Sequence, residues 1–323
     1  MRVLLTGGAG YIGSHLADAC IRRGDEVVVV DNLSTGRIEN VRHLLAHPRF
    51  QFVNDSILNE VLLERFVPSV DLVFHLAAAV GVRHVLEDPL AAINTNVRGT
   101  EVVLHLAFKY WKRAVIASSS EIYGKAGHVP YREDDDRVLG STAVARWSYS
   151  MSKAIDEHFA FAYAAKGLPI AIVRYFNSYG PRLDERGYGS VVANLTRQAL
   201  HGEPLTVHGD GKQTRCFTYI TDTVAGTLLA GEVPEAVGQA FNIGNPVETS
   251  ILSLAQTIKR LARSRSPMTF MSYEAYYGEG FEDTRRRVPA IDKAKQLLGF
   301  TPRVGLEAGL RKTIQWCRTH FMH

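Results

Sequence analysis

The chain has 323 residues, 46% of them hydrophobic and 22% charged, and its formal net charge at pH 7 is +4. This composition is typical of a globular protein, the length is large for one hydrophobic core, and so small a net charge does not favour nucleic acid binding. No apolar run approaches the roughly 20 residues that cross a bilayer, and a strand is expected at the very start, so we expect no signal peptide, no membrane association and a cytoplasmic location.

The first predicted elements are a strand, a glycine-rich turn, a helix and a second strand. The two strands cover residues 2–6 and 26–31, and Gly8, Gly10 and Gly13 between them satisfy the G-x-G-x-x-G spacing. In that spacing the glycines allow a tight turn, a close approach of the backbone to a pyrophosphate, and packing of the helix on the sheet. The pattern predicts a dinucleotide site, and a strand–turn–helix unit without a ligand is the structural alternative.

Asp31 ends the second predicted strand. A carboxylate at this point can accept both hydroxyls of an adenosine ribose and would repel a 2′-phosphate. The sequence therefore favours NAD over NADP as cofactor, with Arg37 in the same loop as the residue that could receive a 2′-phosphate instead.

Further strands are predicted at 50–54, 72–76, 114–118 and 170–175, with helical patterns between several of them. This alternation is typical of an α/β fold with a doubly wound parallel Rossmann sheet. Ligands of such sheets bind outside the carboxyl ends of the strands. We therefore expect the site among Thr6, Asp31 and the segments 76–78, 118–120 and 174–175.

The pattern changes after residue 176, where Gly-Pro pairs and shorter elements appear, with helices expected at 190–201 and 250–262. We expect residues 1–175 to form an NAD-binding domain, to which 216–246 returns, and residues 176–323 to form a smaller substrate-binding lobe over the open end of the sheet.

The three cysteines, Cys20, Cys216 and Cys317, lie far apart and follow no metal-ligand spacing. They are expected to be reduced, mostly buried thiols, and we expect no metal site.

Tyr149 and Lys153 stand at i and i+4 at the start of a helix predicted over residues 149–166. Such positions share one helix face, and an adjacent ammonium favours the ionised form of a phenol. Tyr149 could then remove a proton from a hydroxyl while a hydride leaves the same carbon for NAD. A pair of solvated side chains on a helix surface is the alternative interpretation.

Residues 118–121, Ser-Ser-Ser-Glu, follow the strand before that helix. Ser119 could polarise a substrate oxygen. Glu121 is a candidate acid, base or water-orienting group, with the capping of a turn as the alternative.

The chain resembles the extended short-chain dehydrogenase/reductases that act on nucleotide sugars. The resemblance covers essentially the whole chain and rests on Tyr149 with Lys153 and on the ordered segments 6–14, 75–78, 94–97 and 174–182. It implies tightly bound NAD, a UDP-sugar as the common substrate, and an oxidation at C4 of the sugar as the first step.

Roles for individual residues follow from this resemblance. It implies a cofactor set of Gly7, Gly10, Tyr11, Ile12, Asp31, Asn32, Asp55, Ser56, Leu76, Ala77, Ala78, Asn96, Tyr149 and Lys153. It implies a substrate set of Arg83, Asn177, Val191, Arg215, Tyr277 and Arg287. The catalytic residues that it implies are Tyr149, Lys153, Ser119, Ser120, Glu121 and Arg287.

A ketone at C4 opens three outcomes, namely epimerisation, dehydration across C5–C6, and loss of carbon dioxide from a uronate. The hexose dehydratases of this group carry an aspartate where Ser120 stands, and typical UDP-glucose 4-epimerases lack a carboxylate at the position of Glu121. The pair Ser120-Glu121 resembles that of UDP-glucuronate decarboxylases.

Residues 146–153 and 276–291 also resemble that decarboxylase group, including the decarboxylase domain of the aminoarabinose pathway. The second segment nominates Arg287, since a guanidinium can hold a carboxylate in a bidentate fork. Arg285 and Arg286 beside it are interpreted as a solvated turn.

The sequence thus predicts an NAD-dependent UDP-glucuronate decarboxylase. A UDP-sugar C4 epimerase is the nearest alternative, followed by a 4,6-dehydratase and by an NAD-binding protein without turnover. The resemblance also implies a homodimer formed by two helices of each subunit, expected at 90–110 and 149–166. Their apolar residues could equally pack inside the subunit: Val97, Val102, Leu106, Phe159, Phe161 and Tyr163.

Overall fold

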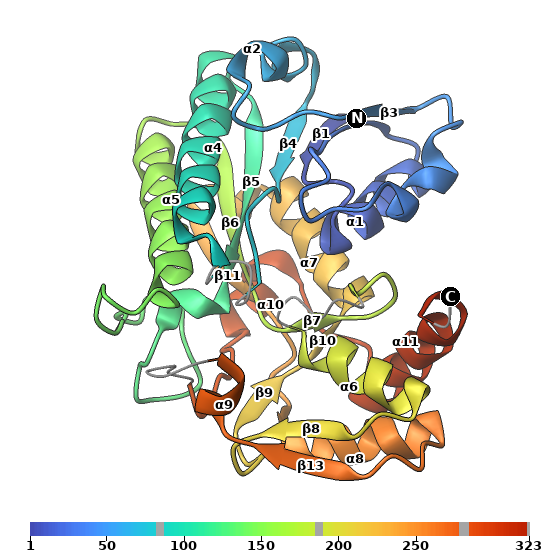
Figure 1. Ribbon diagram of the computed structural model, residues 1–323. Coiled ribbons are helices and arrows are strands. Elements are labelled where there is room, and N and C mark those ends of the chain that lie inside the picture. The colour runs from blue at the N-terminus through green and yellow to red at the C-terminus, as the bar shows by residue number, and fades with distance from the viewer. Residues whose placement is uncertain (82–86, 185–189, 278–283, 322–323) are drawn as a thin grey trace.

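A parallel sheet of seven strands runs through the computed structural model, which describes residues 1–81, 87–184, 190–277 and 284–321 (Figure 1). The strand order is β11-β6-β5-β4-β1-β2-β3, and all neighbours are parallel. The chain winds outward from β1 to β3 and then returns to β4 on the other side of β1. This arrangement confirms the predicted doubly wound fold and creates a crevice at the carboxyl ends of β1 and β4.

Six of the strands match the predicted ones closely, and the seventh comes from residues 216–246. The sheet strands are β1 (Arg2–Thr6), β2 (Glu26–Val30), β3 (Phe50–Val53), β4 (Leu72–His75), β5 (Arg113–Ser119), β6 (Ile170–Tyr175) and β11 (Gln239–Ile243). β11 pairs with β6 from Gln239 opposite Ala171 to Ile243 opposite Tyr175. The later chain therefore completes one edge of the sheet.

Helices cover both faces of the sheet, as near-continuous apolar strands require. On one face lie α2 (Glu60–Leu63), α4 (Pro89–Lys109) and α5 (Trp147–Ala165), and on the other lie α1 (Tyr11–Arg22) and α7 (Ile220–Glu232) (Figure 1). Successive side chains of each strand point to opposite faces of the sheet and therefore belong to different hydrophobic cores. Leu4 and Val28 pack with α4 and α5, whereas Val3 and Leu5 pack with α1 and α7.

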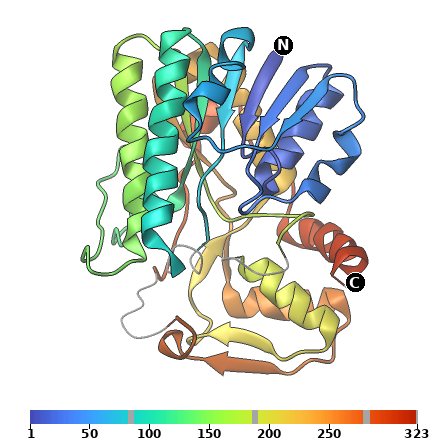
Figure 2. The ribbon, with the colours of Figure 1, turned by 45° about the horizontal axis from the view of Figure 1, so that its top comes forward.

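Most of the remaining elements gather at the carboxyl ends of the strands (Figure 2). Three short strand pairs lie here: β7 (Ser178–Tyr179) with β10 (Thr218–Tyr219), β8 (Leu205–His208) with β13 (Met268–Met271), and β9 (Thr214–Cys216) with β12 (Glu248–Ser250). The helices there are α6 (Val191–His201), α8 (Ile251–Ala262), α9 (Tyr273–Tyr277) and α11 (Leu306–His320). α10 (Asp292–Leu298) instead packs against α7 and β11 of the sheet. Among the described residues, the 3-10 turns are η1 (Ile38–Asn40), η2 (Arg42–Leu44), η3 (Val67–Ser69), η4 (Ser120–Tyr123) and η5 (Pro234–Ala236).

The predicted helices at 190–201 and 250–262 are confirmed as α6 and α8. Each begins after a serine whose hydroxyl caps the first turn, Ser190 accepting from the Ala193 N–H and Ser250 from that of Ser253.

All three cysteines are buried, as the sequence predicts. None of the helices within the described residues is long and apolar enough to cross a membrane. In the same part of the chain, no group of three or more His, Cys, Asp or Glu side chains could hold a metal ion.

Candidate active site

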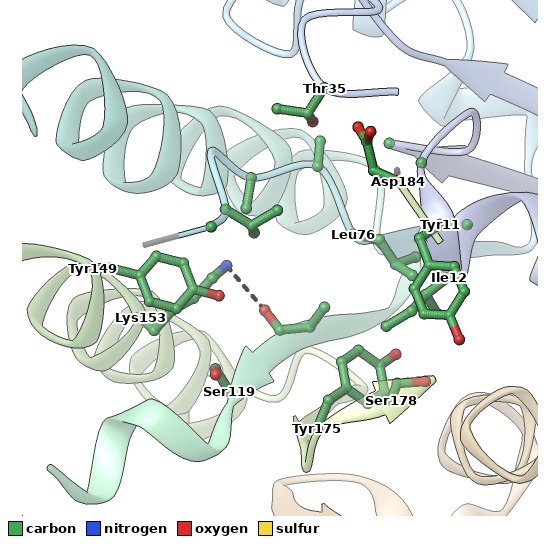
Figure 3. A pocket seen from close by; sticks show the side chains of 18 of the residues that line it. Tyr11, Ile12, Thr35, Leu76, Ser119, Tyr149, Lys153, Tyr175, Ser178 and Asp184 are labelled. Carbon is green, nitrogen blue, oxygen red and sulfur yellow. Dashed lines mark hydrogen bonds between the residues drawn. The ribbon is translucent and has the colours of Figure 1, made fainter. Parts of the chain in front are cut away.

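A cavity of about 450 Å³ opens at the carboxyl ends of β1, β4, β5 and β6. Its walls come from the loops after these strands, from the start of α5, and from Val191 and Arg287 of the later chain. Figure 3 shows Tyr11 and Ile12 at one end of this space and Tyr149, Lys153 and Ser119 at the other. The cavity therefore spans the distance between the glycine-rich turn and the predicted catalytic residues.

The glycine-rich turn is shaped by close approach of the backbone. Gly7 has a φ of +72°, and a Cβ there would lie 2.6 Å from the Ala77 nitrogen. The tight turn thus falls on Gly7 rather than on Gly8, which instead packs against Val29. A Cβ on Gly13 would lie 2.2 Å from the Gly7 carbonyl oxygen, which explains the close packing of α1.

The start of α1 is suited to an anion. Gly10 is its N-cap and offers no side-chain cap, so the first N–H groups of the helix have no cap partner there. Such N–H groups, with the positive end of the helix dipole, are a common site for a pyrophosphate. The cradle and the helix start together fit a dinucleotide.

Asp31 is held in place by backbone donors. Its Oδ2 accepts from the Ala9 N–H at 2.9 Å and its Oδ1 from the Leu33 N–H at 2.8 Å. Burial raises the pKa of this carboxyl above its ordinary value, and the backbone hydrogen bonds oppose the rise. Arg37, the alternative phosphate ligand, pairs with Asp184 at 3.0 Å.

The predicted cofactor residues fall into two groups: those that line the cavity, and Asn96, which does not. Those that line the cavity are Gly7, Gly10, Tyr11, Ile12, Asp31, Asn32, Asp55, Ser56, Leu76, Ala77, Ala78, Tyr149 and Lys153. Asn96 lies behind the wall, where its Oδ1 accepts from the Ala79 N–H at 2.7 Å and its Nδ2 donates to Ser152 Oγ at 3.1 Å. Asn96 therefore joins the loop after β4 to α5.

Tyr149 and Lys153 reach the cavity from the first turns of α5 (Figure 3). Lys153 Nζ donates to the Ala117 carbonyl of β5 at 3.0 Å and to Asp156 Oδ2 at 3.1 Å. Burial raises the pKa of Tyr149, while Lys153 and a hydrogen bond with Ser119 lower it. The expected effect of Lys153 is present, but in the protein alone burial outweighs it.

The end of β5 carries the serine run into η4. Ser119 and Ser120 line the cavity, and Ser119 Oγ accepts from the Glu121 N–H at 3.2 Å. Ser118 also lines the cavity, but its hydroxyl donates to Glu157 Oε1 at 2.6 Å.

Glu121 lies between two arginines. Arg287 Nη1 donates to its Oε1 at 2.6 Å, and Arg146 Nη2 donates to its Oε2 at 3.4 Å. Burial would raise the pKa of Glu121, but Arg287, Arg146 and Arg215 reverse this and lower it to about 2. Glu121 is therefore a carboxylate, and this end of the cavity attracts anions.

The predicted substrate residues are only partly placed. Asn177, Val191 and Arg287 line the cavity. Arg215 is buried just beyond that wall, and its charge still acts on Glu121. Arg83 and the side chain of Tyr277 lie outside the described residues.

Arg146 is the main residue of the site that the sequence reasoning did not single out. It is buried, lines the cavity, and its guanidinium lies 5.3 Å from the centre of the Trp147 ring. Its position three residues before Tyr149 was the available signal, because that spacing places it one helical turn away.

The arrangement can perform two tasks at one site. Tyr149, Lys153 and Ser119 form a proton-transfer group at the carboxyl end of β5. Glu121 with Arg287 and Arg146 forms an anion-binding group next to it.

Comparison with known proteins gives a consistent result. Residues 4–313 match the protein family described as GDP-mannose 4,6 dehydratase. The chain is 43% identical to a UDP-N-acetyl-alpha-D-glucosaminuronate decarboxylase of Bacillus cytotoxicus, with 98% of each chain covered. It is 39% identical to UDP-glucuronic acid decarboxylase 1 of Xenopus tropicalis, over all of this chain and 73% of that protein.

Among solved structures, the UDP-glucuronic acid 4-epimerase of Bacillus cereus, in complex with UDP-glucuronic acid and NAD, matches with a TM-score of 0.89. It is 30% identical, and the match covers 99% of this chain and 100% of that one.

Proposed function

Because the chain belongs to the family described as GDP-mannose 4,6 dehydratase, we propose that it is an NAD-dependent decarboxylase of a UDP-linked hexuronate. Its substrate would be UDP-glucuronate or the N-acetylated derivative that the relative from Bacillus cytotoxicus is named for. The observation that carries the proposal is the cluster of Glu121, Arg287 and Arg146 beside Tyr149.

NAD fits the chain's own residues. The Gly7 cradle and the start of α1 would hold the pyrophosphate, Asp31 the adenosine ribose, and Lys153 the nicotinamide ribose. When bound, NAD supplies a reversible acceptor for hydride and a positive charge near Tyr149.

The first step oxidises C4. Tyr149 takes the proton of the C4 hydroxyl as the C4 hydride leaves, while Ser119 polarises the same oxygen. Lys153 stabilises the phenolate, which offsets the rise in the Tyr149 pKa that burial causes.

The second step breaks the C5–C6 bond. With a ketone at C4, the uronate is a β-keto acid, so the bond's electrons can pass into the ketone as carbon dioxide leaves. Arg287 would hold the C6 carboxylate in a bidentate fork. The enolate that remains would take a proton at C5 from solvent, with Glu121 and Ser120 placed to direct it, and this new C–H bond replaces the C5–C6 bond.

The experiment that tests this function is an incubation with NAD and each of two substrates labelled at C6, UDP-glucuronate and its 2-N-acetyl derivative. Labelled carbon dioxide from either one supports the proposal and identifies the sugar. Retention of the label in both sugars, with no product, would refute it.

A C4 epimerase is the second candidate, because the Bacillus cereus 4-epimerase shares the whole fold with this chain. An epimerase would return the hydride to the other face of C4 and keep C6. Inversion at C4 without carbon dioxide release in the same incubation would identify it.

We also propose a homodimer through α4 and α5, which pack side by side. Leu90 is 78% exposed and Ile93 is exposed on α4, and Met151, Ile155 and Phe161 are exposed on α5. Leu106, one of the candidate dimer residues, is instead fully buried inside the subunit, because it faces the sheet.

The cytoplasmic location stays a prediction. The division into a cofactor domain, residues 1–175 with 216–246, and a sugar lobe is likewise our proposal.

A further inference from the structure

Lys153 belongs to a buried ion pair that the reaction scheme above does not use. Its Nζ lies 3.1 Å from Asp156 Oδ2, one helical turn further along α5, and the two side chains are 3% and 0% exposed. The other carboxylate oxygen, Asp156 Oδ1, is buried and has no hydrogen-bond partner. Burial raises the pKa of Asp156 above its ordinary value, and the neighbouring Lys153 and Thr100 oppose this rise. Water screens the charges of this buried ion pair only weakly, so each acts strongly on its neighbours.

The groups around this pair leave Asp156 as the carboxylate in direct contact with Lys153. Glu157 is engaged by Arg174 and Ser118, and Glu121 by Arg287. From β4, His75 faces the pair, but burial, with a smaller effect of Lys153, lowers its pKa to about 3, so it is neutral. Its Nε2 shares a hydrogen bond of 3.0 Å with Thr100 of α4.

The charges act on Tyr149 in opposite directions. Burial alone would lower the pKa of Lys153, but Asp156 foremost, and then Tyr149 and Glu157, reverse this and leave it raised. Burial raises the pKa of Tyr149, Lys153 lowers it, and the negative charges of Glu121 and Asp156 raise it again. Asp156 therefore keeps the ammonium charged and at the same time weakens its effect on the phenol.

We propose that Asp156 is a positioning residue: it holds Lys153 against β5 and offsets its charge, and it thereby sets the pH at which Tyr149 ionises. The inference rests on the proposed role of Tyr149 as the base, but not on which sugar is bound or which product leaves. Under this proposal the buried carboxylate of Asp156 does more than neutralise Lys153, because it also adjusts the ionisation of Tyr149.

Removal of the Asp156 charge should lower the ionisation midpoint whether Tyr149 or Lys153 is the group that loses its proton. Tyr149 and Lys153 titrate as a coupled pair, and removal of a nearby negative charge makes the first loss of a proton easier for either. Asp156→Asn, which keeps an oxygen for the Lys153 hydrogen bond, should shift that ionisation down by about one pH unit.

The test is an ultraviolet titration of phenolate absorbance in the NAD-loaded protein, with the same titration of a Tyr149→Phe background subtracted. Asp156→Asn and Asp156→Ser should both lower the midpoint, although they differ in volume. Glu101→Gln, on the exposed side of α4, removes one negative charge nearby and should leave the midpoint in place. An unchanged midpoint in the Asp156 variants overturns the proposal.

A second measurement needs no substitution at Asp156, in case the neutral variants do not fold. In protein labelled with carboxyl ¹³C aspartate, one resonance should inflect at the pH of the Tyr149 midpoint, and Tyr149→Phe should abolish that inflection. Its absence in the wild type refutes the proposal. Neither titration uses a sugar, so a failed decarboxylation assay leaves this result standing, and the converse holds.

Discussion

Arg287 donates to Glu121 across 2.6 Å and thereby ties the chain before α10 to the end of β5, from which it is separated by 166 residues. Both side chains line the cavity. In the proposed reaction a substrate carboxylate exchanges with Glu121 as the partner of Arg287.

Arg287→Met should therefore separate the two steps. We expect carbon dioxide release to fall by about 100-fold or more, because a charge-assisted fork on the carboxylate is lost, while C4 oxidation still produces NADH absorbance. Single-turnover absorbance together with trapping of labelled carbon dioxide measures both steps. Arg286→Met is the matched control, since Arg286 is exposed and pairs with Glu248 outside the cavity. Equal loss of both steps in Arg287→Met would contradict the assignment.

The lowered pKa of Glu121 predicts a pH-dependent stability. A carboxyl with a pKa of about 2 in the folded protein and an ordinary value of 4.5 stabilises the fold above pH 4.5. That contribution is lost as the pH falls from 4.5 toward 2. The wild type should then exceed Glu121→Gln by on the order of 3 kcal/mol in free energy of unfolding at pH 7, and the difference should shrink below pH 4.5.

Denaturant unfolding at pH 7, 5 and 4 measures this difference. Glu235→Gln replaces an exposed carboxylate and should match the wild type throughout. A gap between the wild type and Glu121→Gln that stays constant with pH would show that Glu121 acts by packing rather than by charge.

Local patterns explain which parts of this molecule were predictable. The turn at 7–13 and Asp31 depend on neighbouring residues, so their spacing was enough to predict the dinucleotide cradle. The strands were predictable because both faces of a parallel sheet are buried and their apolar runs are continuous. β11 was harder, because its place at the sheet edge depends on pairing with the distant β6.

The electrostatics of the site were harder to predict from the sequence. Arg287 was found through resemblance, whereas the contacts of Arg146 with Glu121 and of Asp156 with Lys153 required the packed helix α5. The raised pKa of Tyr149 could not be inferred either, because desolvation depends on every element that excludes water from the phenol.

Asp31 should determine the choice between NAD and NADP. Asp31→Asn removes the negative charge that would repel a 2′-phosphate, so we expect the ratio of the NADPH and NADH dissociation constants to fall about tenfold. Fluorescence titration with each nucleotide measures the ratio. Glu39→Gln is the control, because Glu39 follows Asp31 along the same segment but is exposed, pairs with Arg42 and lies outside the cavity wall. An unchanged ratio in Asp31→Asn would rule out the proposed contact with the ribose.

The exposed apolar residues of α4 and α5 predict that a charge placed among them will separate the dimer. Ile155→Glu places a charge within the proposed dimer surface, where burial without a partner is costly, so the variant should sediment as a monomer at concentrations at which the wild type is a dimer. Val247→Glu is the control, since Val247 is as apolar and 65% exposed but lies on the loop before β12. Because Met151 and Ile155 are on the helix that carries Tyr149 and Lys153, we also expect the monomer to bind NAD less tightly. A monomeric wild type, or a dimeric Ile155→Glu, would exclude this surface as the interface.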